Sequence, residues 1–124
     1  VKCVVAQHSS SLPDGSYGGN PMGFLVFSDE GNFYYSGDTA LTLDMQLIPG
    51  WVKLKYAVLP IGDNFTMDVA DATECARFIK CDQIVGVHYD TFGYITIDHE
   101  KAVAKFRDAG MQLHLVPIGD SVNL

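Results

Sequence analysis

Short apolar runs separated by turn residues recur along the chain, and they limit what it can fold into. Six of these runs have the length of a β-strand and are rich in Val, Ile, Leu, Phe and Tyr. They occupy residues 1–6, 22–27, 33–35, 56–61, 83–87 and 111–116. The turn residues Glu30, Gly31 and Asn32 join the second run to the third, which predicts a β-hairpin. None of the runs approaches the ~20 apolar residues of a membrane-spanning helix, so the sequence predicts no membrane protein.

Two segments have the period of an amphipathic helix. The first spans residues 68–80, where Asp68 can serve as the N-cap. Its predicted inner face consists of Val69, Ala72, Ala76 and Ile79. The second spans residues 98–109 and should end at Gly110. Its predicted inner face consists of Ala102, Val103 and Phe106. Residues 40–48 are weakly helical.

The order of these elements predicts the fold class. Strands and helices alternate in the later part of the chain, which favours helices packed on a sheet. The hairpin in the earlier part adds antiparallel strands. We therefore expect an α/β (α+β) domain with a mixed sheet and flanking helices.

Length and composition exclude several classes of protein. The chain has 124 residues, enough for one domain, and 48% of them are hydrophobic, which disfavours disorder. Its formal charge of −7 disfavours binding to the phosphate backbone of a nucleic acid. The three cysteines (Cys3, Cys75 and Cys81) have no CxxC spacing, and unpaired thiols favour a cytoplasmic location.

Polar residues that can bind metals follow most of the predicted strands. His8 follows the first strand, Asp38 the third, Asp63 and Asn64 the fourth, and His88 the fifth. Ligands of α/β proteins bind beyond the ends of the strands, so we expect these side chains to share one edge of the sheet. Imidazole and carboxylate groups suit zinc, iron or manganese.

Each of these residues alone has a simpler structural interpretation. A histidine after a strand is commonly a hydrogen-bonded loop residue, and Asp38 could belong to a turn. Asp63 and Asn64 could cap the following helix. We expect His99 to be a solvated residue in the first turn of its helix. We expect His114 to point outward from its strand and Cys75 to pack in the core.

Four segments, taken in order, carry a resemblance to a known family. They are His8–Ser11, Tyr35–Ala40, Leu59–Met67 and His88–Phe92. Together they resemble the C-terminal half of a metallo-β-lactamase-fold hydrolase, in the cytoplasmic and mostly uncharacterised branch of that superfamily. The resemblance implies a four-layer αββα sandwich whose two similar halves hold metals at a shared edge. Residues 1–124 would form the second half of a single domain, and the family's H-x-H-x-D-H motif would lie upstream of Val1. That Val1 already lies inside an apolar run agrees with this expectation.

The resemblance also implies roles for individual residues. His8 matches the third metal-ligand motif of the family. Asp38 matches the carboxylate that bridges two metals and takes part in catalysis. His88 matches the histidine that completes the second metal site. Asp63 and Asn64 match a loop beside the site. The implied cofactor is a pair of divalent ions, zinc first, with manganese or iron as alternatives.

The implied activity is hydrolysis of an ester, lactone, amide or phosphodiester bond in a small-molecule substrate, through water activated by metal. Because half a sandwich leaves an apolar sheet face uncovered, we expect that face to bind the missing N-terminal half or another copy of the chain. One alternative is a non-catalytic fragment that folds with such a partner. Another is a complete small α/β binding module, which a metal chelator would not destabilise.

Overall fold

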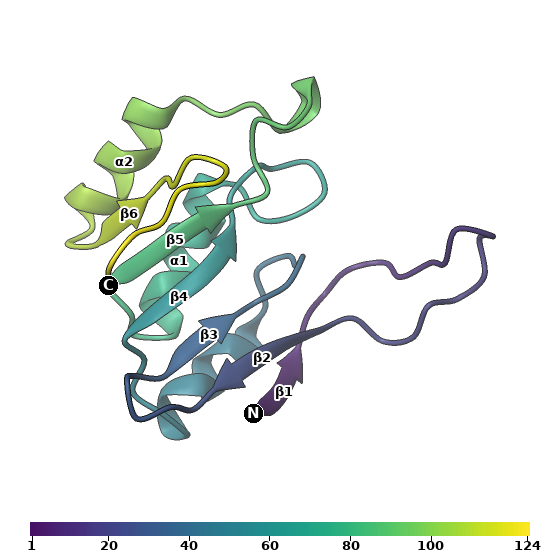
Figure 1. The fold of residues 1–124 in the computed structure, drawn as a ribbon, viewed down its shortest axis with the longest axis horizontal. Helices are drawn as coiled ribbons and strands as arrows, with labels where there is room; N and C mark the ends of the chain where they lie inside the picture. The colour runs from purple at the N-terminus through teal and green to yellow at the C-terminus, as the bar shows by residue number, and fades with distance from the viewer.

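The computed structural model describes all 124 residues, which form one mixed sheet with helices on one side. The strands are β1 (Lys2–Val5), β2 (Met22–Val26), β3 (Phe33–Tyr35), β4 (Tyr56–Pro60), β5 (Gln83–Val87) and β6 (Gln112–His114). They lie in the order β1-β2-β3-β4-β5-β6 (Figure 1). β2 pairs antiparallel with both β1 and β3. The neighbours from β3 to β6 pair parallel with one another. The predicted hairpin and the mixed sheet are confirmed.

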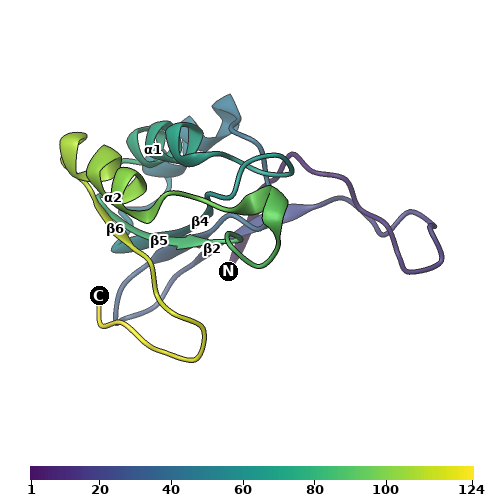
Figure 2. The ribbon, with the colours of Figure 1, turned by 90° about the horizontal axis from the view of Figure 1, so that it is seen from above.

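The helical segments make the crossovers between the parallel strands. A 3₁₀ helix, η1 (Leu43–Gly50), connects β3 to β4, and α1 (Val69–Phe78) connects β4 to β5. A short 3₁₀ turn, η2 (Gly93–Ile95), and α2 (His99–Asp108) connect β5 to β6. α1 and α2 cover the same face of the sheet (Figure 2). None of the helices is long and apolar enough to span a membrane.

The predicted N-cap of α1 is confirmed, and α2 has an N-cap of the same kind. Asp68 accepts a hydrogen bond from the backbone N–H of Asp71, and Asp98 accepts one from that of Lys101. Gly110 adopts φ +78°, a left-handed conformation that ends α2. The weakly helical segment predicted at residues 40–48 is instead the 3₁₀ helix η1, which begins later, at Leu43, and contains Pro49. A proline removes a backbone donor, which is incompatible with a regular α-helix interior.

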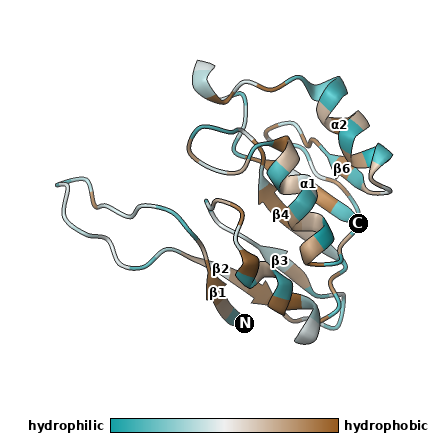
Figure 3. Ribbon diagram, turned by 180° about the vertical axis from the view of Figure 1, so that it is seen from behind, coloured by the Kyte–Doolittle hydropathy of each residue, from teal (hydrophilic) through white to brown (hydrophobic).

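The core lies between the sheet and the helices. Leu25, Tyr34, Ala57, Leu59 and Ile84 project from the strands and are fully buried. Ala72, Cys75 and Ala76 of α1 and Ala102 and Phe106 of α2 meet them. The prediction for Val103 is wrong, because this side chain is 40% exposed on the outer side of α2. The ribbon of α2 is mostly hydrophilic, whereas much of β1 and β4 is hydrophobic (Figure 3).

The opposite face of the sheet carries no helix, and we call it the open face. Residues paired in register share a face, so Phe24, Tyr35, Val58 and Val85 point away from the helices. The aromatic rings of Phe33 and Tyr56 stack on this face at a centroid distance of 4.9 Å. The segment after β6 passes on this side of the sheet (Figure 2). Tyr35 is 45% exposed, so the open face presents apolar side chains that this chain leaves partly uncovered.

Candidate metal centre

Four loops meet at one edge of the sheet. β1 runs in the same direction as β3, β4 and β5, because two antiparallel pairings separate it from β3. The loops that follow these four strands therefore leave the sheet at the same edge (Figure 1). His8, Asp38, Asp63 and His88 each belong to one of these loops. The predicted placement beyond the strand ends agrees with the structure.

Backbone hydrogen bonds hold these loops together. Ala40 N donates to the carbonyl of Gln7 (3.0 Å), and Met67 N donates to that of Thr39 (3.0 Å). Gln7 N donates in turn to the fully buried hydroxyl of Thr39. Thr39 therefore contacts both the loop after β1 and the loop after β4, and it fixes the backbone next to Asp38.

The side chains of His88 and Asp38 face each other across the edge of the sheet. His88 Nε2 lies 3.6 Å from Asp38 Oδ2, beyond hydrogen-bond distance. The His88 side chain is 28% exposed and that of Asp38 47%. The other ring nitrogen of His88, Nδ1, is buried and has no hydrogen-bond partner. An imidazole nitrogen and a carboxylate oxygen that face each other without a hydrogen bond are suitable ligands for a divalent metal. The pair therefore fits the metal that the family resemblance implies.

His8 lies in the neighbouring loop but does not complete a cluster. Its Nδ1 donates to the carbonyl of Ser9 (2.8 Å), which leaves Nε2 as the nitrogen with a lone pair. No group of three or more His, Cys, Asp or Glu side chains lies close enough together to hold a metal ion. The structure thus brings together His88 and Asp38, and it places His8 one loop away.

Asp63 and Asn64 shape the loop after β4 rather than the helix that follows it. Both are left-handed, with φ 65° and 55°. Asp63 Oδ1 accepts from the backbone N–H of Asn64 (2.6 Å), and Asn64 Nδ2 donates to the carbonyl of Tyr94. The suggestion that they cap the helix is wrong, because Asp68 caps α1. They connect the loops after β4 and β5 instead.

The backbone around His88 is unusual. His88 and Asp90 have φ 56° and 62°, in the left-handed region that residues with a Cβ rarely adopt. Gly62 packs against this turn, and a Cβ added to it would lie 2.1 Å from the carbonyl oxygen of His88. The loop after β4 can approach the loop after β5 so closely only because residue 62 is glycine.

A pair that sequence reasoning missed lies beyond His88. Asp90 Oδ2 accepts from His99 Nε2 (2.5 Å), and Asp90 Oδ1 accepts from the backbone N–H of Ile97 (3.0 Å). The hydrogen bond from His99, followed by that from Ile97, lowers the pKa of the Asp90 carboxyl below its usual value. His99 is exposed in the first turn of α2, as expected, and it also has a specific partner in Asp90. Nothing in a nine-residue separation across a loop indicates such a pair.

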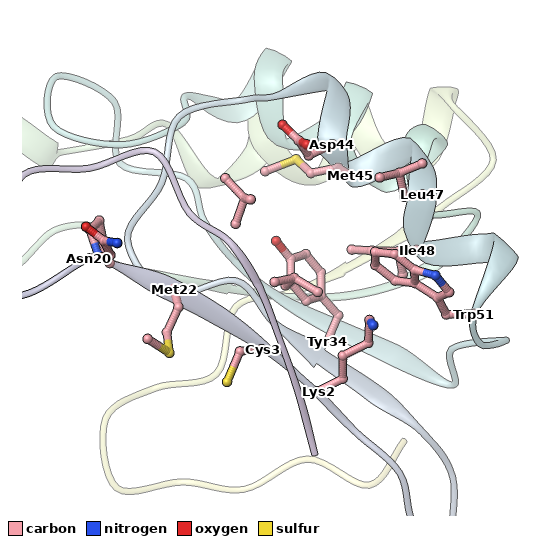
Figure 4. A pocket seen from close by; sticks show the side chains of 13 residues that line it. Lys2, Cys3, Asn20, Met22, Tyr34, Asp44, Met45, Leu47, Ile48 and Trp51 are labelled. Atoms are coloured by element: carbon pink, nitrogen blue, oxygen red, sulfur yellow. The ribbon is translucent and has the colours of Figure 1, made fainter.

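A separate pocket lies between β1, β2 and η1 (Figure 4). Its volume is about 360 Å³, and Met22, Met45, Ile48 and Trp51 are among the apolar residues that line it. The buried hydroxyl of Tyr34 has no hydrogen-bond partner there, and burial raises its pKa above the usual value. Neither His88 nor Asp38 lines this pocket, so we do not assign it to the metal centre.

The comparisons with known proteins decide the family. A family model described as a beta-lactamase superfamily domain matches residues 1–89. The chain belongs to this superfamily. Over all 124 residues it is 59% identical to a protein of Christiangramia forsetii and 43% identical to one of Thermus thermophilus, both named UPF0173 metal-dependent hydrolase. It covers 55% of each of these relatives and so spans about half their length.

Solved structures of this superfamily confirm the fold. Igni18, a metallo hydrolase from Ignicoccus hospitalis, is 33% identical with a TM-score of 0.84, over 97% of this chain and 50% of that one. A putative Zn-dependent hydrolase of the metallo-beta-lactamase superfamily from Thermotoga maritima is 17% identical with a TM-score of 0.62, over 84% and 50% of the two chains. The metallo-β-lactamase fold predicted from the four sequence segments is therefore confirmed.

Proposed function

We propose that this chain is the C-terminal half of a metal-dependent hydrolase whose ligands include His8, Asp38 and His88. The facing pair of His88 and Asp38 carries the proposal, because His88 Nε2 and Asp38 Oδ2 lie 3.6 Å apart without a hydrogen bond, where both can be ligands of an ion. The names of the relatives support the same class of activity. The remaining ligands would come from the half that the relatives possess and this chain does not span.

The chain's own residues would each have a defined task. Asp38 would supply a carboxylate ligand, and the buried Thr39 beside it fixes its backbone. His88 supplies an imidazole nitrogen, and His8 can supply Nε2 because its Nδ1 already donates to Ser9. When bound, divalent ions lower the pKa of a water molecule from 15.7 to about 7 and polarise a carbonyl or phosphoryl oxygen. We assign two ions, with zinc first and manganese or iron as alternatives.

We propose hydrolysis of an ester, lactone, amide or phosphodiester bond of a small molecule, for which ions held by His8, Asp38 and His88 would supply an activated water. Only Arg77 and Arg107 supply guanidinium groups, both on helices, and each contacts a neighbouring acidic side chain. A phosphate clamp of arginines is therefore not part of the proposal. We also propose a cytoplasmic location, which is supported by the three free cysteines.

The test compares histidine variants of the full-length protein. We expect His88→Ala to lose the metal of one site and to lower kcat/KM by roughly a hundredfold or more, because an electrophilic centre is lost. His114→Ala is the matched control, since His114 is also half-buried but bonds Gln83 on β5, away from this edge. Metal content is measured by elemental analysis, and activity with a panel of ester, lactone, amide and phosphodiester substrates. A His88→Ala protein that keeps its full metal content contradicts the assignment.

We further propose that the open face packs against the sheet of the other half of the protein. Sheets that pack face to face need apolar side chains on both inner faces, and Phe24, Tyr35, Val58 and Val85 supply them on this side. The alternative is a fragment that covers this face with a second copy of itself. Light scattering on the isolated 124-residue chain tests whether this face needs a partner, because a stable monomer would count against the half-domain proposal.

A further inference from the structure

We infer that Asp90, held by His99, is a positioning residue that fixes the left-handed backbone of His88 and so aims its imidazole at Asp38. The inference rests on the proposed function, in which His88 is a metal ligand. It concerns residues outside the set that would contact the metal, and five contacts within this chain support it.

The turn that carries His88 needs an external constraint. His88 and Asp90 both have positive φ, with only Tyr89 between them. Each non-glycine residue in that region is disfavoured by about 1 kcal/mol or more relative to a right-handed or extended one. Left to itself, the segment would relax and turn the imidazole away from Asp38. Something in the surroundings must therefore hold the turn.

Asp90 provides that constraint through three hydrogen bonds to three different places. Its backbone N–H donates to the carbonyl of Ile95 (2.9 Å), which closes the loop containing η2. Its Oδ1 accepts from the N–H of Ile97 (3.0 Å), just before α2. Its Oδ2 accepts from His99 Nε2 (2.5 Å), in the first turn of α2. One carboxylate thus fastens the end of the His88 turn to the start of a helix.

The other end of this connection is rigid, because α2 is anchored in the core. Phe106 is fully buried and Ala102 is 2% exposed, so the helix cannot shift without opening the core. The ring of Tyr89 contacts that of His99 edge-on at a centroid distance of 5.6 Å. On the opposite side, Gly62 lies against the carbonyl of His88. The turn is therefore held between the loop after β4 and the N-terminus of α2.

The test uses the full-length protein, stripped of metal and titrated with Zn²⁺ by calorimetry. Groups that orient a metal-binding histidine typically contribute about 10–100-fold to metal affinity. We therefore expect Asp90→Ala to weaken Zn²⁺ binding at least about tenfold and to alter the visible spectrum of the Co²⁺-loaded protein. We expect Asp90→Asn to stay within about threefold of the wild type, because it keeps the shape and an acceptor for Ile97 N–H, and its amide N–H can donate to His99 Nε2 in the other neutral tautomer of that ring. Asp108→Ala is the control, because it removes an exposed carboxylate from the last turn of the same helix.

A second variant covers the case in which Asp90→Ala fails to fold. His99 is half-exposed, so His99→Ala should fold, and we expect it to weaken Zn²⁺ binding in the same direction. Unchanged affinity and an unchanged Co²⁺ spectrum in Asp90→Ala or His99→Ala would overturn the inference. Equal losses in Asp90→Ala and Asp90→Asn would also overturn it, because they would point to the negative charge rather than to position.

Hydrogen exchange of the metal-free protein separates this inference from the proposed function. We expect faster exchange of the Ile97 amide and of residues 88–98 in Asp90→Ala, but not in Asp108→Ala. If exchange rises as expected and His88→Ala still binds Zn²⁺ like the wild type, the proposed function is wrong. The conclusion that Asp90 holds the turn of His88 is then still supported. If exchange does not change, the positioning role itself is wrong.

Discussion

At the scale of single residues, the candidate site depends on close contacts between backbones. Gly62 and the carbonyl of His88 approach so closely that no side chain fits between them. His88, Asp90, Asp63 and Asn64 all adopt left-handed conformations within two neighbouring loops. Such conformations persist only where the surroundings enforce them, and they are commonest at functional sites. Their concentration beside the His88 and Asp38 pair agrees with the proposed role of this edge.

Replacing Gly62 by alanine tests how closely the two loops must pack. The added Cβ would lie 2.1 Å from the carbonyl oxygen of His88 and 3.0 Å from Cβ of Ile95, so one of the loops must move. We expect Gly62→Ala to destabilise the full-length protein by about 1–3 kcal/mol, as overpacking does, and to weaken metal binding. Urea unfolding measures the first effect and Zn²⁺ titration the second.

The matched control for this prediction is Gly50→Ala. Gly50 is exposed and does not have a positive φ, and a Cβ added to it would have no atom within 4 Å. The substitution should change the free energy of unfolding by no more than about 0.5 kcal/mol. Gly62→Ala and Gly50→Ala proteins of equal stability would show that the contact with His88 is not restrictive.

At the scale of helices and strands, the sequence pattern predicted most of the architecture. The cap Asp68 and the terminating Gly110 are local signals, and both were confirmed. Val103 was misplaced because three apolar positions on a short helix do not define the centre of its buried face. η1 was less well predicted because residues 40–48 lack a strong period and Pro49 lies inside the turn. These errors concern segments whose structure depends on neighbours distant in sequence.

The site was predictable only in part for the same reason. Strand order places His8, Asp38 and His88 at one edge of the sheet, and both the local patterns and the family resemblance indicated this. The distance between His88 and Asp38 depends on loop conformation, which no spacing rule supplies. The pair of Asp90 and His99 joins a loop to a helix by side chains alone. The assignment of His8, Asp38 and His88 as metal ligands stays a prediction.

At the scale of the whole molecule, the sheet has one face packed under helices and one open face. The open face is apolar along its centre, as Phe33 stacked on Tyr56 and the row Tyr35, Val58 and Val85 illustrate. The chain spans about half the length of its relatives, so the rest of the protein is the occupant we propose for this face.

A charge placed on the open face tests whether it is covered. We expect Val58→Asp to destabilise the full-length protein by at least about 3 kcal/mol, because an unpaired carboxylate would be buried between two sheets. Val103→Asp, on the exposed side of α2, serves as the control and should cost less than about 1 kcal/mol. Thermal unfolding measures both. Similar melting temperatures for the two variants would mean that Val58 faces water.

The most direct measurement of the central claim is anomalous X-ray diffraction from crystals of the full-length protein loaded with Zn²⁺, recorded on both sides of the zinc absorption edge. We predict an anomalous peak within bonding distance of His88 and Asp38, at the edge of the sheet where β3 and β5 end, and its loss in His88→Ala crystals. A zinc peak coordinated elsewhere, with His88 and Asp38 still facing each other and binding nothing, would contradict the account.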